Sequence, residues 1–261
     1  MTEPGAMPPS RVAFAVVMIG IGLWGFAQSA FVAVWAPGIQ PPELRGAVAL
    51  SCAAISTACG ASLLWERTAR LAARILLAWL ILWLVWCKGA ALLHAPADFA
   101  SWESVGETAV IGAAAAALAA SGTNAREEAA ARVVYGLAMI AFGAAHFGYA
   151  TMTASLVPGW LPSHLAWVYF TGATYIAAGV ALVIDRAATA AARLSALQMG
   201  LFGLLVWLPK IVAGGGDPDT LNEAAISFAL AVSGWVVATA MCGRAQQEER
   251  AGRSPTLSAT A

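Results

Sequence analysis

Long apolar segments separated by short polar ones run through the whole chain. The longest follows Arg132 and continues to Gly179 without an Asp, Glu, Lys or Arg. Its clear break is the corner Val-Pro-Gly-Trp-Leu-Pro at 157–162, where two prolines end one helical segment before another begins. An uncharged run of this length predicts two membrane-spanning helices joined by a short turn.

The same punctuation by charge and proline divides the rest of the chain into segments near the ~20 residues that a helix needs to cross a bilayer. It predicts eight spans, at 12–35, 45–65, 72–93, 104–121, 133–156, 164–184, 194–212 and 222–242. Composition agrees, because 60% of the residues are hydrophobic and only 11% are charged, whereas about 25% are charged in a soluble domain. The sequence therefore predicts an all-α, polytopic membrane helix bundle.

An internal repeat relates the two halves of the chain. When the sequence is shifted by 121 residues, 11–45 lies on 132–166 without a gap, and 11 of the 35 pairs are identical. The corner P-G-x-x-P occurs in both segments, at 37–41 and at 158–162. These matches predict a tandem duplication of one four-helix unit.

The repeat sets the predicted domain boundaries, with flanking stretches at 1–10 and 244–261 that are polar and are expected to be disordered. The units are 11–121 and 132–243, and a cytoplasmic linker at 122–131 joins them. Because each unit has an even number of spans, the two are expected to run parallel, related by a pseudo-two-fold axis along the membrane normal.

The basic residues predict the orientation. Eight spans put both termini on the same side of the membrane. Of the 14 basic residues, three fall on the opposite side, namely Arg45, Lys88 and Lys210. Since positive residues favour the cytoplasm, both termini are expected to be cytoplasmic in a bacterial-type plasma (inner) membrane. The lipid bilayer is then the first partner of the protein.

His146 is the first candidate for a functional residue. It lies well inside the fifth predicted span, where an ionisable group is costly and indicates function. The alternative is a neutral histidine that serves as a hydrogen-bonded link between helices. Its repeat partner is Gly25, so the two halves differ here, which favours the second half as the location of a site.

Several polar residues fall near His146 in the predicted topology and could line an outward-facing ligand-binding pocket with it. They are Tyr149, Tyr169, Tyr175, Lys210 and Glu223. The alternatives are an interfacial belt for the tyrosines and a snorkelling pair at the headgroups for Lys210 and Glu223. Lys88 with Glu103 or Glu107 makes the corresponding pair in the first half.

Motifs for chemistry are scarce. Cys52 and Cys87 fall at similar depth on consecutive spans, which allows a redox thiol pair, although cysteine also commonly behaves as a small buried hydrophobe. The sequence contains no His-Glu-x-x-His, no Cys-x-x-Cys and no Gly-rich phosphate loop, so it predicts neither a metal nor a nucleotide site. A net charge of zero gives no indication of a nucleic-acid partner.

The second half resembles the DoxX-like membrane protein family. The similarity is carried by G-x-x-H-F at 143–147, L-V-P-x-W-L-P at 156–162, W-V-Y-F-T-G at 167–172, A-A-G at 177–179 and GLLVWLP at 203–209. It covers the first half only weakly. The resemblance implies an accessory or ligand-binding component of a membrane redox system, quinone- or thiol-based, with a lipid-like quinone or a membrane redox protein as partner.

Two other functions stay open. One is a small-solute or proton-coupled transporter, and the other is a structural or assembly protein without a ligand. The sequence has no paired-His haem arrangement and no clustered thiols, so independent catalysis is not predicted. The surroundings of His146 discriminate among the three: a sealed interface favours a structural role, a cleft open to lipid favours the accessory role, and a water-filled cavity favours transport.

Overall fold

The computed structural model describes residues 7–36, 45–214 and 216–253. Within those residues every regular element is a helix and no strand occurs. Seven helical runs in this part of the chain are long and apolar enough to cross a membrane. They confirm the predicted all-α class and support a multi-pass membrane protein.

Five of the seven runs are single helices, namely α1 (Pro9–Gln28), α5 (Phe99–Ala120), α6 (Ala125–Gly148), α8 (His164–Val183) and α11 (Pro218–Arg253). The other two contain a five-residue π-helical segment. One consists of α3 (Glu66–Trp83), η3 (Leu84–Lys88) and α4 (Gly89–His94), and the other of α9 (Ala188–Phe202), η4 (Gly203–Trp207) and α10 (Leu208–Val212). Such π segments inside helices occur frequently at functional sites.

One further long helix, α2 (Arg45–Ser62), occupies the second predicted span. It begins at a charged residue and is rich in Ala, Ser and Gly, so it is less apolar than the seven runs. Its small residues allow close contact with α1: a Cβ atom added to Gly60 would lie 2.9 Å from the backbone oxygen of Ala15. Small residues at helix contacts are typical of membrane bundles, and the count of eight spans stays a prediction.

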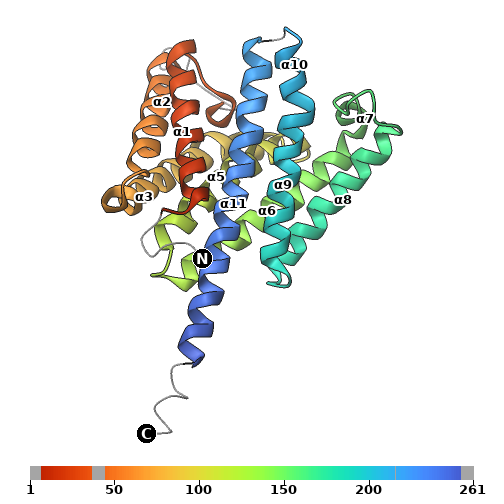
Figure 1. Cartoon of the computed structure of the whole chain (residues 1–261). Helices are drawn as coiled ribbons and strands as arrows, with labels where there is room; N and C mark the ends of the chain where they lie inside the picture. The colour runs from red at the N-terminus through yellow and green to blue at the C-terminus, as the bar shows by residue number, and fades with distance from the viewer. Residues whose placement is uncertain (1–6, 37–44, 215, 254–261) are drawn as a thin grey trace, which may run out of the picture.

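The helices form two groups around a central pair. Figure 1 shows α1, α2 and α3 on one side, α6, α8 and α9 on the other, and α5 and α11 between them. The second group repeats the close approach seen between α1 and α2, because a Cβ atom on Gly136 of α6 would lie 2.9 Å from the backbone oxygen of Gly179 of α8.

Two predicted spans end earlier than expected. The first was expected to reach residue 35, but α1 ends at Gln28 because Ser29 adopts the left-handed conformation, with φ 51°. The chain then turns inward into the short 3-10 helix η1 (Ala33–Trp35). The fifth was expected to reach residue 156, but α6 ends at Gly148 and the chain changes direction at Tyr149 before the one-turn helix α7 (Ala150–Ala154).

Helices also extend into segments expected to be irregular. The side chain of Asn124 caps α6, so most of the predicted linker 122–131 is helical. Helix α11 continues to Arg253, so 244–253 is helical rather than disordered, and Figure 1 shows this end projecting beyond the other helices. Residues 1–6 and 254–261 and the first predicted corner, 37–41, lie outside the described residues.

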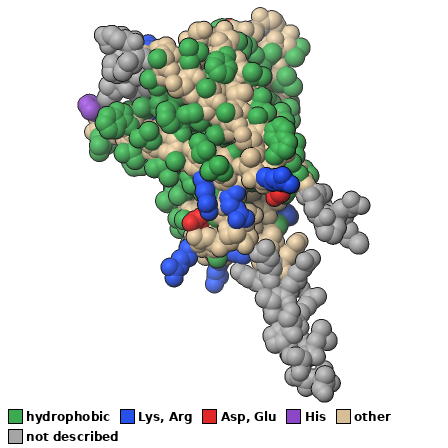
Figure 2. Space-filling model, turned by 90° about the vertical axis from the view of Figure 1, so that its left-hand side faces the viewer, with side chains coloured by type: hydrophobic (Ala, Val, Ile, Leu, Met, Phe, Trp, Pro, Cys, Tyr) green, Lys and Arg blue, Asp and Glu red, His purple; other side chains and the backbone are tan. Residues whose placement is uncertain are grey.

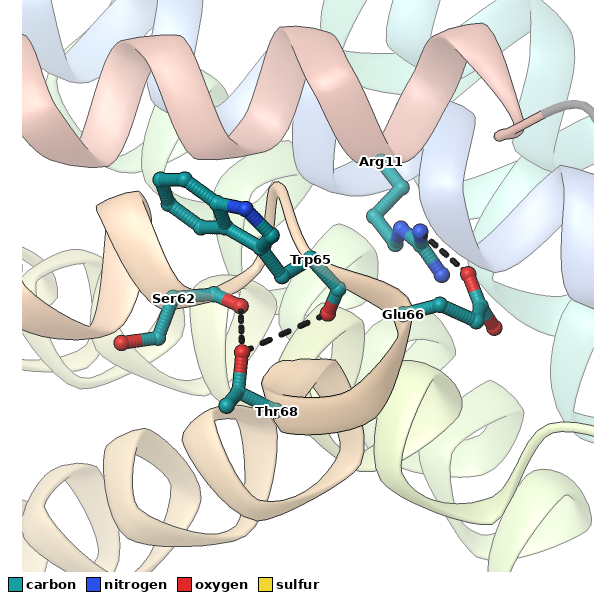
Figure 3. Close-up of polar contacts among 5 residues, drawn as sticks. All are labelled: Arg11, Ser62, Trp65, Glu66 and Thr68. Carbon is teal, nitrogen blue, oxygen red and sulfur yellow. Dashed lines mark hydrogen bonds and ion pairs between the residues drawn. The ribbon is translucent and has the colours of Figure 1, made fainter.

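Basic side chains gather at one end of the molecule. Figure 2 shows Lys and Arg at the lower end, below a largely hydrophobic face, and α1 begins at this same end. Here Arg11 of α1 forms a 2.6 Å ion pair with Glu66 at the start of α3, and Thr68 donates to the backbone oxygen of Ser62 at 2.7 Å (Figure 3). In the second half Arg132 of α6 pairs with Asp185 at 3.3 Å, just after α8.

Candidate functional site

A cavity of about 390 Å³ lies among α5, α6, α7, α8, α9, η4 and α11, and we call it the acidic cavity. This volume is within the range of roughly 300–1,000 Å³ that is usual for small-molecule sites. Its ionisable and phenolic lining residues are Glu103, Glu107, His146, Tyr149, Tyr175 and Glu223. Three carboxylate side chains therefore line one partly open cavity among apolar helices.

The helical spacing explains two of the carboxylates. Glu103 and Glu107 are four residues apart on α5, which places both on one face of that helix. Tyr149 follows the end of α6 and donates its hydroxyl hydrogen to the carboxylate of Glu103. The bond connects the segment after α6 to α5. The side chains of Glu107 and Glu223 make no hydrogen bond or ion pair among the described residues.

His146 is oriented by its own helix. Its Nδ1 lies 2.8 Å from the backbone oxygen of Phe142, and a carbonyl can only accept, so Nδ1 carries the hydrogen. In the neutral ring Nε2 is then an acceptor. The ring packs edge-on against Tyr175 of α8, with a centroid distance of 5.4 Å. The histidine thus forms part of the cavity wall and retains one polar atom for another partner.

Trp207 contributes a buried donor without a partner. It ends the π segment η4, lines the acidic cavity and is only 8% exposed. Its indole Nε1 is buried and has no hydrogen-bond partner among the described residues. A buried N–H group left unpaired is costly, so a residue that lines the cavity carries a donor that lacks an acceptor.

A single buried ammonium lies beside α5. Lys88, at the end of the π segment η3, is 3% exposed, and its Nζ donates to the hydroxyl oxygen of Ser104 at 2.5 Å. Ser104 is adjacent to Glu103 in sequence. No ion pair of 4.0 Å or less joins Lys88 to a carboxylate in the described part of the chain.

A second cavity, of about 420 Å³, adjoins the first, and we call it the apolar groove. It lies between α8, α9, η4 and the segment after α7. Its apolar lining includes Val157, Leu161, Trp167, Phe170, Leu201 and Leu205, and Thr171 and Gln198 are among its few polar residues. His146, Thr153, Tyr175 and Phe202 line both cavities and so form a common wall.

The corresponding region of the first half is packed with aromatic side chains. After α1 the chain folds inward and buries Val32, Val34 and Trp35. The indole of Trp35 donates to the hydroxyl oxygen of Ser56 at 2.9 Å and stands edge-on to Trp83, with a centroid distance of 5.8 Å. The segment after α6 does not fold inward in this way, because it continues into α7.

The structure brings together four of the six residues predicted for the pocket: His146, Tyr149, Tyr175 and Glu223 line the acidic cavity. Tyr169 lies elsewhere, since it is 47% exposed and its ring stacks on Phe147 at 5.7 Å. Lys210 lies on α10, exposed, with its Nζ 4.5 Å from the centroid of the Trp207 ring.

Glu103 and Glu107 were not predicted as site residues, because the sequence pattern pairs them with Lys88 as charged side chains at the headgroups. Their spacing of four within an apolar span was the available signal, since it predicts a shared helical face.

Cys52, on α2, and Cys87, on η3, are buried free thiols, and no cysteine of the described chain is in a disulfide. Among the described residues no group of three or more His, Cys, Asp or Glu has the arrangement of a metal site. The redox thiol pair stays a prediction.

Comparison with known proteins identifies a match to part of the second half. A family model described as a domain of unknown function (DUF8561) matches residues 135–207. This range holds His146, Tyr149, Tyr175 and Trp207 but none of the three carboxylates of the acidic cavity. No curated protein and no solved structure matches the chain.

Proposed function

We propose that this protein is a multi-pass membrane protein that binds an amphipathic, lipid-soluble molecule between α5 and the helices of its second half. The acidic cavity would hold the polar head and the apolar groove would hold the hydrocarbon part. The observation that carries the proposal is the common wall, formed by His146, Thr153, Tyr175 and Phe202. Because the same residues line both cavities, the cavities adjoin, and together they fit a molecule with one polar and one apolar end.

The proposed role is binding rather than catalysis. The resemblance to DoxX-like proteins supports an accessory component of a membrane redox system, with a quinone or a redox protein as partner. The apolar groove suits the tail of a quinone, and the acceptor Nε2 of His146 and the donor Nε1 of Trp207 suit hydrogen bonds to a polar head.

A second candidate is proton-coupled transport. One specific observation favours it: Glu107 lies eight residues into α5 and lines the cavity, where a carboxylate could take up and release a proton. A structural role without a ligand fits the packed first half better than the second half with its two cavities.

We also propose that the chain is a tandem duplication of a four-helix unit with eight spans. Matching contacts support the duplication. Arg11 and Arg132, 121 residues apart, pair with Glu66 and Asp185, 119 residues apart. The two π segments, 84–88 and 203–207, are likewise 119 residues apart.

The duplication implies that both termini lie on one side, and the basic end of the molecule favours the cytoplasm of a bacterial-type plasma membrane. A fluorescent protein fused to the C-terminus should fluoresce in bacterial cells, because the fluorescent protein itself matures in the cytoplasm. Alkaline phosphatase fused at the same place should be inactive. The reverse pattern would overturn the orientation.

Ligand binding can be tested with amphiphiles that share a decyl chain: 1-decanol, a decyl-substituted benzoquinone and 2-(decylamino)ethanol. They are added to protein in lipid nanodiscs, and bound molecules are counted by native mass spectrometry. We expect at least one of the three to bind at one molecule per chain. In Thr153→Phe binding should be lost, because the added ring occupies the space where the two cavities adjoin.

Val180→Phe provides the matched control, since Val180 is 44% exposed on α8 and lines neither cavity. This variant should bind as the unchanged protein does. Failure of all three probes, or equal binding by the two Phe variants, would contradict the proposed function.

A further inference from the structure

We propose that the ligand is a lipophilic amine whose ammonium group is held by the carboxylates of the acidic cavity. The same molecule carries a neutral oxygen close to its ammonium group. This inference rests on the proposed function and adds the chemistry of the head. It is drawn from the charges around the cavity, the aromatic surfaces of its wall and one unpaired donor.

The charges around the cavity do not balance. Glu103, Glu107 and Glu223 line it, whereas the buried basic side chain beside α5 is Lys88. Lys88 donates to Ser104 and is an electrostatic neighbour of Glu107, and Lys210, exposed over the Trp207 ring, is one of Glu223. Neither lysine forms an ion pair of 4.0 Å or less in the described part of the chain. Glu103 and Glu107 are half-buried and Glu223 is exposed, and half-buried carboxylates in a membrane protein favour a counter-charge or a proton. A ligand with an ammonium group would supply the counter-charge.

The wall of the cavity suits an organic cation better than a metal ion. Phe142, Tyr175, Phe202 and Trp207 all line it, and aromatic faces attract ammonium groups. No group of acidic residues with metal-site geometry occurs in the described part of the chain. In the neutral ring, Nε2 of His146 can also accept a hydrogen bond from an ammonium N–H.

The unpaired donor extends the description of the head. The indole Nε1 of Trp207, buried and without a partner among the described residues, needs an acceptor. An ammonium has none, so a ligand that also carries a hydroxyl or ether oxygen next to the ammonium fits the site better than a simple amine. A phosphate oxygen would bring an anion among three carboxylates, and this excludes zwitterionic phospholipids as the preferred ligand. The chemistry that remains is that of a long-chain amino alcohol.

Head-group selectivity can be measured on the unchanged protein with the same three decyl probes. The amino alcohol should bind at least about tenfold more tightly than 1-decanol or the quinone, because a charge-assisted hydrogen bond is roughly twice as strong as a neutral one. Equal affinities would overturn the amine while leaving the proposed function intact. Failure of all three probes would overturn both.

Variants of the carboxylates provide the second measurement. Glu107→Gln and Glu223→Gln keep the shape of the side chain and remove its charge, and each should reduce affinity for the amino alcohol about tenfold. Glu127→Gln is the matched control, because Glu127 is exposed in the first turn of α6, at the other end of that helix from His146, and does not line the cavity. Unchanged affinity in both Gln variants would show that the carboxylates hold protons rather than the ligand. The probe comparison stands even where a variant does not fold.

Discussion

The hydroxyl of Tyr149 donates to the carboxylate of Glu103, and this bond joins the segment after α6 to α5 across 46 residues of sequence. It lies where the two halves of the chain meet. It also occupies one side of the acidic cavity, so the position of Glu103 depends on the place where α6 ends. If α6 continued through Tyr149 as one straight helix, the side chain of Tyr149 would point in another direction.

The first prediction concerns this bond. Tyr149→Phe removes the donor and leaves a partly buried carboxylate without its partner, which should lower the free energy of unfolding by about 1–3 kcal/mol. Thermal unfolding in detergent should show a fall of several degrees. Tyr169→Phe is the control, because the hydroxyl of Tyr169 has no hydrogen-bond partner in the described chain and its ring is 47% exposed. Equal melting temperatures of the two variants would count against a structural role for the bond.

The second prediction concerns the close helix contacts. Gly136→Ala places a methyl group 2.9 Å from the backbone oxygen of Gly179, so α6 and α8 must separate, and the variant should be destabilised by roughly 1–3 kcal/mol. Gly20→Ala is the control, since a Cβ there meets nothing within 4 Å. In an open helical position alanine is favoured over glycine by about 0.5–1 kcal/mol. The melting temperatures should therefore shift in opposite directions, and a shift of the same sign would contradict the packing.

The third prediction concerns the packed first half. Trp35→Ala removes a side chain that is 1% exposed, and the cost should be about 3–5 kcal/mol. The space vacated by the Trp35 side chain should bind added indole. Indole should then raise the melting temperature of this variant by mass action, but not that of the unchanged protein. Trp235→Ala is the control, because Trp235 is 43% exposed and its removal opens no cavity. An equal response of both variants to indole would rule out the void.

The sequence allowed most of the helices to be predicted, because long uncharged runs have few alternatives in a membrane. Their ends were harder to predict. Helix α1 stops at Gln28 because Ser29 adopts a left-handed conformation, a local choice that apolar composition does not reveal. The inward turn to Trp35 depends on a hydrogen bond to Ser56 on another helix.

The site was predicted in part for a similar reason. Tyr175 and Tyr169 are six residues apart on α8, which places them roughly 120° apart around the helix, so their side chains lie on different faces. Helical phase alone could have excluded one of them. The bond between Tyr149 and Glu103 could not have been predicted in this way, since it depends on how α5 and α6 pack together.

The last prediction concerns His146, whose two nitrogens have different roles. Nδ1 makes a bond within α6, to the backbone oxygen of Phe142, while Nε2 is available to a ligand. A glutamine can replace a local donor, so His146→Gln should keep the melting temperature of the ligand-free protein within about one degree. Its affinity for the decyl probe that binds best should fall roughly tenfold, because the amide cannot both donate to Phe142 and accept from the ligand with the geometry of a rigid ring. His94→Gln is the matched control, since the Nδ1 of His94 makes the same bond four residues back, to Ala90 at 2.8 Å, on an exposed surface away from both cavities. Equal probe affinities in the two variants would assign His146 to packing alone, and a large loss of stability in His146→Gln would do the same.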